Sequence, residues 1–218
     1  MKLTRLTFTF SAATLAALTA LSLLGCGGGG GGSTSNPTPT PSPSPTPSSD
    51  DLVAGVSHNW KNGAQTTGDI GKSAIGFTFV AKTNITVTEL GYYDDGGDGL
   101  GIDHPVTLFD ATGTTRLAEA TVRAGTVDTL RGKFRYRSIT PVNLTAGTTY
   151  VLAGYHDSAS TSDVFVYGTL LEGFITDSRI TIASSSSRYL YYSGGTPLPF
   201  PTQSIGYIIY AGPSLFIP

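Results

Sequence analysis

Cysteine is almost absent from this 218-residue chain, which contains Cys26 alone. One cysteine has no partner within its own chain, so a fold held by internal disulfides is excluded. The hydrolase patterns H-x-x-E-H, H-E-x-x-H and G-x-S-x-G are absent as well. The three histidines, His58, His104 and His156, are scattered. We therefore predict that the protein is not an enzyme. A glycan-active hydrolase is the less favoured alternative, because paired carboxylates for glycoside cleavage are defined by their separation in space.

Charge of either sign is scarce. Lysine and arginine total 13 and aspartate and glutamate total 15, which gives a formal net charge of −2. General nucleic-acid binding relies on a basic surface, so we predict no nucleic-acid partner. Long apolar runs are limited to a segment from about Phe8 to Leu24, which polar residues interrupt. That length is at the lower limit for crossing a membrane.

The N-terminal residues resemble a bacterial lipoprotein signal. Lys2 and Arg5 precede the apolar segment, and Leu23-Leu24-Gly25-Cys26 closes it, in the layout of a secretory signal. The resemblance implies that residues 1–25 are a signal peptide and that the thiol of Cys26 is lipidated. It also implies a membrane partner through that lipid and a location in the bacterial cell envelope. Gly27, rather than Asp, follows the cysteine, which resembles lipoproteins destined for the outer membrane.

Residues 26–50 have the composition of a linker that follows the lipidated cysteine. Gly27 to Gly32 is unbroken glycine, and Ser33 to Ser49 alternates proline with serine and threonine. Glycine is flexible, whereas spaced proline is extended at about 3.1 Å per residue, so the second part alone spans about 50 Å. We predict a tether that holds the rest of the chain away from the membrane.

Residues 51–218 are numerous enough for one domain with a hydrophobic core. Apolar residues alternate with polar or small ones, as at Ile75, Phe77 and Phe79, and no stretch carries a sustained helical face. Turn clusters such as Thr145-Ala146-Gly147 separate these runs. The pattern predicts an all-β domain, a single antiparallel β-sandwich of roughly nine or ten strands with jelly-roll or immunoglobulin-like order.

Several segments carry a family resemblance. They are, in chain order, Ile75 to Phe79, Val87 to Leu100, His104 to Asp110, Leu117 to Val122, Phe134 to Tyr136 and Leu144 to Leu152. Together they resemble an uncharacterised family of exported bacterial β-sandwich domains, also seen in proteins with a C-terminal Pro-Glu-Pro (PEP-CTERM) sorting signal. The resemblance implies a fold and a location, and it brings no catalytic residues. No sorting helix precedes Pro218, so we expect the lipid on Cys26 to provide the anchor.

The segment from Asp94 to His104 concentrates carboxylates. Its aspartates are interleaved with glycines, which allow tight backbone curvature, and they are Asp94, Asp95, Asp98 and Asp103. Calcium prefers such oxygen ligands, although Pro105 stands where an EF-hand carries its bidentate glutamate. Two interpretations stay open: a calcium site, which makes calcium the one cofactor to test, and a solvated turn between strands.

Four basic residues occur at every second position: Arg131, Lys133, Arg135 and Arg137. On one strand their side chains share a face, while Phe134 and Tyr136 point to the other. The predicted basic ladder is about 20 Å long. It is suited to an anionic polysaccharide or a lipid phosphate, because arginine forks bind such groups bidentately. The alternative is the polar side of an ordinary amphipathic strand, with its basic residues discouraging edge pairing.

Three aromatic residues are further candidates for ligand binding: Trp60, Tyr191 and Tyr192. Exposed rings stack on sugar faces, whereas buried rings fill the core of a sandwich. Tyr191 and Tyr192 are adjacent, so on a strand one of them faces away from the core. Both interpretations stay open for these residues.

The sequence as a whole predicts a binding module that is anchored to the cell envelope, with surface polysaccharide as the first ligand class. The alternative is a structural or protein-interaction module of the bacterial surface that uses exposed strand edges. Since one fold serves many functions, the predicted sandwich does not decide between them.

Overall fold

Antiparallel strands account for the regular structure of the part of the chain that the computed structural model describes. The described residues are 57–58, 71–94, 96–157, 163–168, 174–206 and 209–218, and no helix occurs among them. They all belong to the second of the two units into which the chain divides, Pro43–Pro218. The predicted signal peptide, Cys26, the linker, Trp60 and Asp95 lie outside the described residues.

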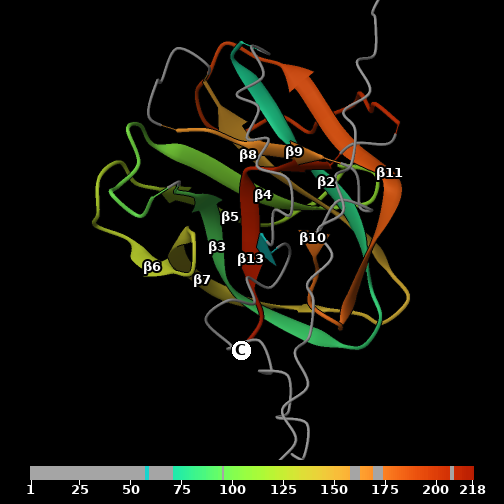
Figure 1. The fold of residues 1–218 in the computed structure, drawn as a ribbon. Helices are drawn as coiled ribbons and strands as arrows, with labels where there is room; N and C mark the ends of the chain where they lie inside the picture. Colours follow the sequence, from blue (N-terminus) through green and yellow to red (C-terminus); the bar gives the residue numbers. More distant parts are fainter. Residues whose placement is uncertain (1–56, 59–70, 95, 158–162, 169–173, 207–208) are drawn as a thin grey trace, which may run out of the picture. The chain divides into compact units, whose positions relative to one another are not determined.

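Two antiparallel sheets make up most of the domain (Figure 1). The larger has the order β11-β2-β8-β4-β5 and consists of β2 (Ser73–Ala81), β4 (His104–Asp110), β5 (Arg116–Val122), β8 (Thr149–His156) and β11 (Ile180–Tyr191). The smaller has the order β13-β3-β7-β6 and consists of β3 (Ile85–Tyr93), β6 (Thr129–Arg131), β7 (Phe134–Leu144) and β13 (Pro213–Phe216). Successive strands therefore pass repeatedly from one sheet to the other.

Two short strand pairs complete the described structure. β1 (Ser57–His58) pairs with β10 (Phe174–Ile175), and β9 (Val166–Gly168) pairs with β12 (Ile209–Ala211). None of the described residues forms a helix long and apolar enough to cross a membrane.

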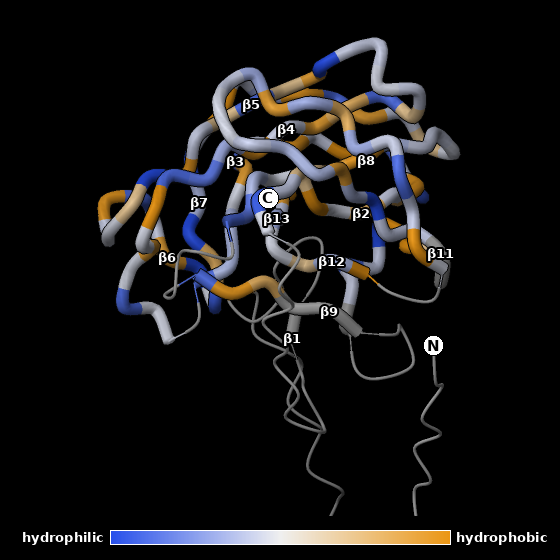
Figure 2. The backbone as a smooth tube through the Cα atoms, turned by 90° about the horizontal axis from the view of Figure 1, so that it is seen from above, coloured by the Kyte–Doolittle hydropathy of each residue, from blue (hydrophilic) through white to orange (hydrophobic). Residues whose placement is uncertain are grey.

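The hydrophobic core lies between the two large sheets. One buried cluster joins apolar side chains from both of them, among which are Phe77 and Phe79 of β2, Leu108 of β4, Leu152 of β8, Leu90 of β3 and Leu215 of β13. Figure 2 shows β4, β5 and β8 in one layer and β3, β7 and β13 in the next, with apolar residues recurring along strands of both. The predicted all-β sandwich is thus confirmed.

Strands β2 and β8, which lie side by side inside the larger sheet, are buried on both faces. Phe77 is opposite Leu152, and Phe79 is opposite Tyr150, so their side chains share the face that meets the core. On the opposite face, Ala74 and Val151 belong to a second buried cluster, which Leu198 covers. Since both faces of these strands are buried, they are apolar on both sides.

Candidate functional site

The loop between β3 and β4 is held by a buried ion pair. Asp94 is 2% exposed, and its Oδ2 accepts a hydrogen bond of 2.7 Å from Nε of Arg135, which is 4% exposed. The amide of Gly99 donates to both carboxylate oxygens, at 3.3 and 3.2 Å. Gly99 has a φ of +113°, which L side chains rarely adopt, and this lets the loop return to Asp94. The positive charge that Asp94 meets is therefore a guanidinium of the protein itself.

Arg135 uses all three of its nitrogens in such contacts. Besides Nε, its Nη1 donates to the carbonyl of Asp128 at 3.1 Å, and its Nη2 donates to the carbonyl of Gly97 at 2.9 Å. A guanidinium offers five N–H donors in a fixed fork, which suits one residue to bridging several acceptors. Arg135 thus fastens the β3–β4 loop and the segment before β6 to strand β7.

The prediction that Arg131, Lys133, Arg135 and Arg137 share one exposed strand face is wrong. The chain turns at Gly132, whose φ is +57°, so Arg131 ends β6 and Lys133 lies in the turn before β7. Arg131 is opposite Phe134 in the hairpin, and directly opposed side chains share a face. Arg135 and Arg137 do alternate with Phe134 on β7, but Arg135 is buried and points to the acidic loop. The tight turn reverses the chain within the four-residue pattern and splits it.

Asp98 and Asp103, the other acidic residues of this loop that the structure describes, do not join Asp94 in a metal-binding group. Oδ1 of Asp103 accepts a hydrogen bond of 2.8 Å from the amide of Ala124, and Asp98 is exposed. Within the described part of the chain, no group of three or more His, Cys, Asp or Glu residues is arranged to hold a metal ion. Instead, the acidic loop and the basic segment from Arg131 to Arg137 contact each other through the ion pair of Asp94 and Arg135. Calcium binding by this loop stays a prediction.

An open polar cleft lies beside this loop, between the segment that follows β5 and the strand β7. Its volume is about 330 Å³, and its lining residues are Arg123, Val127, Asp128, Thr129, Tyr136, Arg137 and Ser138. Both views of the fold place β5, β6 and β7 on the same side of the domain (Figures 1 and 2). Of the residues predicted from sequence to bind a ligand, Arg137 is the one that reaches this cleft.

A buried carboxylate orients the two arginines of the cleft. Oδ1 of Asp128 accepts hydrogen bonds from Nη2 of Arg123 at 2.6 Å and from Nε of Arg123 at 3.1 Å, and it lies 3.5 Å from Nη1 of Arg137. Burial by itself raises the pKa of Asp128, but the bonds from Arg123 and the charge of Arg137 outweigh it, so the pKa is lowered. The Asp128 side chain is 4% exposed, whereas those of Arg123 and Arg137 are 45% and 41% exposed. The cleft therefore presents two half-accessible guanidinium groups: Arg123 is held by hydrogen bonds to Asp128, and Arg137 lies within ion-pair distance of the same carboxylate.

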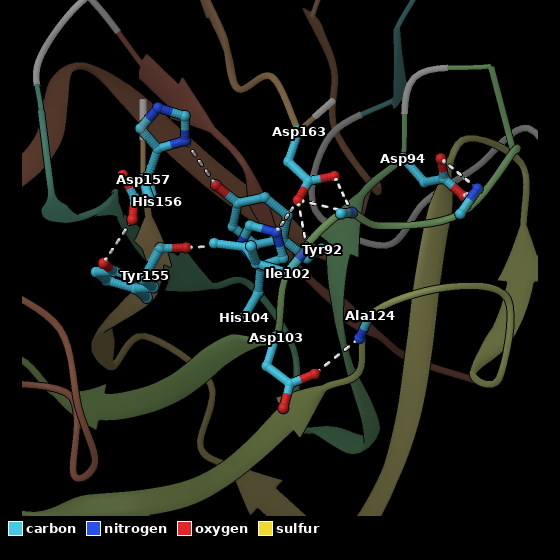
Figure 3. Close-up of polar contacts among 12 residues, drawn as sticks. Tyr92, Asp94, Ile102, Asp103, His104, Ala124, Tyr155, His156, Asp157 and Asp163 are labelled. Atoms are coloured by element: carbon cyan, nitrogen blue, oxygen red, sulfur yellow. Dashed lines mark hydrogen bonds and ion pairs between the residues drawn. The ribbon is translucent and has the colours of Figure 1, made fainter. Parts of the chain in front are cut away.

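A second polar cluster, Tyr92, His104, His156 and Asp163, is enclosed between the sheets (Figure 3). Nε2 of His104 lies 3.0 Å from Oδ2 of Asp163, and Nδ1 of His104 lies 2.8 Å from the carbonyl of Tyr155. The ring of Tyr92 stacks on His104 with centroids 3.7 Å apart, and its Oη lies 3.3 Å from Nδ1 of His156. The cluster thus joins β3 of one sheet to β4 and β8 of the other.

Burial and hydrogen bonding together shift the pKa values of Asp163, His156 and Tyr92. Burial raises the pKa of Asp163, but hydrogen bonds from His104 and from the amides of Gly101 and Ile102 outweigh it and lower the pKa. Burial, with a contribution from His104, lowers the pKa of His156 to about 4. Burial and the charge of Asp163 raise the pKa of Tyr92 well above its ordinary value, and its hydroxyl lies within hydrogen-bond distance of Nδ1 of His156, at 3.3 Å.

This enclosed cluster is structural rather than a ligand site. His104 and Tyr92 are 0% exposed, and His156 and Asp163 are 3% exposed, so a ligand has no access. Apart from the two histidines, no local pattern in the sequence indicates this cluster, because His104 and Asp163 are 59 residues apart and meet only in the folded domain.

A comparison with protein-family models shows which family the chain belongs to. A family model described as "Domain of unknown function (DUF4082)" matches residues 60–210, which is more than half of the sequence. The chain belongs to the DUF4082 family. A comparison with curated proteins finds no match. The prediction of an uncharacterised family is confirmed at this level, and the lipoprotein signal and the link to PEP-CTERM proteins stay predictions.

In this DUF4082 domain the two candidate tyrosines differ in exposure. Tyr191 is 64% exposed, and its ring meets the edge of Tyr189 at 5.9 Å. Tyr192 packs against Tyr155 at 5.9 Å on the outer face of the larger sheet, and its hydroxyl donates to the carbonyl of Gly195. Tyr191 is the last residue of β11 and Tyr192 lies beyond it, and ligand binding by either tyrosine stays a prediction.

Proposed function

We propose that this DUF4082 domain is a non-catalytic binding module of the bacterial cell envelope and that its ligand is a surface glycan. The observation that carries the proposal is the open polar cleft, in which Asp128 holds Arg123 by hydrogen bonds and pairs with Arg137 at 3.5 Å. Groups held in place before binding lose less conformational freedom when the ligand arrives, which favours affinity.

The chemistry of the cleft suits a sugar chain. Sugar hydroxyls both donate and accept hydrogen bonds, and the lining offers guanidinium donors together with the hydroxyls of Thr129 and Ser138. Val127 is 65% exposed and adds an apolar surface at the same place. Ligand sites combine apolar contact with a few placed polar groups in this way.

The proposal includes the N-terminal segments. Lipidation of Cys26 anchors the chain in a membrane, with the outer membrane as the proposed location, and the linker over residues 33–49 lets the domain reach a polymer at some distance. A module that binds an envelope or external polysaccharide needs both an anchor and reach.

A protein partner is the second candidate, because two exposed apolar residues lie close together in the sequence near the cleft. Val127 is 65% exposed and Leu130, on the edge strand β6, is 43% exposed. An edge strand also presents backbone groups that another chain can pair with.

The first test is binding of the full-length chain, carrying Cys26→Ser and purified in detergent, to a panel of bacterial and plant polysaccharides. Saturable binding that Arg123→Gln and Arg137→Gln weaken supports a glycan module with its site in the cleft. Absence of binding to every polymer of the panel overturns the glycan proposal and favours the protein partner. Lys82→Gln, an exposed basic residue outside the cleft lining, is the matched control.

A further inference from the structure

We propose that Arg123 and Arg137 form a subsite for a carboxylate, so that the ligand of the cleft is an acidic polysaccharide built from uronic acid units. This inference rests on the proposed function and names the class of glycan. It starts from the way in which the two arginines share a single carboxylate, that of Asp128.

The charges of the lining do not balance. Arg123 and Arg137 carry two positive charges, and Asp128 is the one acidic residue in the lining. Asp103, which lies outside the lining, also acts on Arg123 as a negative charge, and its Oδ1 accepts a hydrogen bond of 2.8 Å from the amide of Ala124. The lining by itself has two positive charges against one negative charge, and an anionic ligand would bind through the donors that the two arginines leave unused.

Both guanidinium groups keep donors for such a ligand. Arg123 donates to Asp128 from Nε and Nη2, and Nη1 of Arg137 lies 3.5 Å from the same carboxylate. Among the described residues, Nη1 of Arg123 and both Nε and Nη2 of Arg137 have no hydrogen-bond acceptor. A guanidinium edge with two parallel N–H groups matches the two oxygens of a carboxylate, and such charge-assisted bonds are the strong ones.

The rest of the lining favours a sugar acid over a simple anion. The hydroxyls of Thr129 and Ser138 stand beside the arginines and suit ring hydroxyls. The cleft is open and has a volume of about 330 Å³, at the lower end of the range for small-ligand pockets, so it would contact a short part of a polymer. The buried carboxylate of Asp128 contacts both arginines on the side away from solvent, and such supporting contacts help to position a binding group.

The test compares polygalacturonate with its fully methyl-esterified form, because these polymers share a sugar backbone and differ in the free carboxylate. Binding to the full-length Cys26→Ser protein is measured by calorimetry at low and at physiological salt, with dextran and dextran sulfate as a neutral and a sulfated polymer. We expect polygalacturonate to bind at least 10-fold more tightly than the ester, dextran or dextran sulfate.

The variants locate the subsite. Arg137→Gln is expected to weaken polygalacturonate binding by about 10- to 100-fold, the factor for a lost hydrogen bond between charged groups. Arg137→Lys keeps the charge and loses the fork, so it should bind more weakly than wild type and more tightly than Arg137→Gln. Asp103→Asn removes a negative charge near Arg123 and is expected to leave binding unchanged or stronger. Melting temperatures establish that each variant is folded, and Lys82→Gln is the charge-matched control.

The outcomes separate this inference from the proposed function. Equal binding of the ester or of dextran overturns the carboxylate subsite and leaves a glycan module. Equal binding of dextran sulfate shows that charge alone is recognised, and it also overturns the uronate subsite. Tight binding of polygalacturonate that neither Arg137 variant changes places the site elsewhere. No binding to any polymer overturns both proposals.

Discussion

Acidification from pH 7 to pH 5 is expected to destabilise the domain through His156. In the folded protein burial lowers the pKa of this residue to about 4, whereas its ordinary value is 6.5. Between these two values the unfolded chain takes up a proton that the folded chain excludes, so unfolding is favoured as the pH falls. One pKa unit corresponds to about 1.36 kcal/mol, and the expected loss is about 2 kcal/mol at pH 5 and about 3 kcal/mol at pH 4.

The carboxylates act in a different pH range. The folded-state pKa of Asp163 is lowered, so its contribution to stability is present above the ordinary pKa and is lost only as the pH falls through the lowered one. Besides Tyr92 and the ring of Phe165, the groups that face His156 are His104, Asp157 and Asp163. The range from pH 7 to pH 5 therefore separates the titration of the His156 imidazole from that of the Asp163 carboxylate.

The assay is urea unfolding at half-unit steps of pH for wild type and for His156→Asn. Asparagine does not titrate, and it offers Tyr92 an amide oxygen in place of Nδ1. With a urea slope of about 2 kcal/mol per molar, the wild-type midpoint should fall by about 1 M between pH 7 and pH 5. The variant starts lower because it is smaller, and its midpoint should change less over the same range. Parallel pH profiles of the two proteins would refute the reasoning.

Three further predictions follow from the sites described above. Arg135→Gln leaves the buried carboxylate of Asp94 without its partner, so we expect a loss of about 3 to 5 kcal/mol in the free energy of unfolding by urea; a loss below 1 kcal/mol contradicts the clamp. If the loop from Asp94 to Asp103 binds calcium, excess calcium raises the melting temperature relative to EDTA, and identical values end that prediction. Cys26→Ser is expected to abolish incorporation of labelled palmitate and to leave the precursor uncleaved, and a variant that is still labelled and processed would exclude lipidation at Cys26.

Local alternation predicted the strands well in the interior of the larger sheet, where each strand pairs with a neighbour on both sides. Ile75, Phe77 and Phe79 lie in β2, and Tyr150 and Leu152 lie in β8, as the period of two indicates. Ile205 also belongs to an alternating run, with Tyr207 and Ile209, but the bounds of β12 are Ile209–Ala211 and Ile205 lies outside a strand. Its amide instead donates to the hydroxyl of Ser187, a contact across 18 residues that no local pattern contains.

The candidate site was less predictable than the fold, for a physical reason. The charged residues from Arg131 to Arg137 follow a strand period, but Gly132 turns the chain between two of them. The partner of Arg137 in the cleft is Asp128, whose role depends on how the hairpin closes. Tertiary pairing of this kind is set by sheet register and loop closure, which alternation in one segment does not encode.

The three bonds of Arg135 have a consequence for how this corner of the domain opens. The loop after β3, the segment before β6 and the strand β7 are separate along the chain, and one guanidinium holds all three. Detaching any one segment leaves a buried charge or carbonyl without its partner, so each partial opening costs nearly as much as opening them all. We therefore expect the backbone amides of these segments to exchange their hydrogens together, as one cooperative unit. One side chain thereby makes three stretches of backbone behave as a single element.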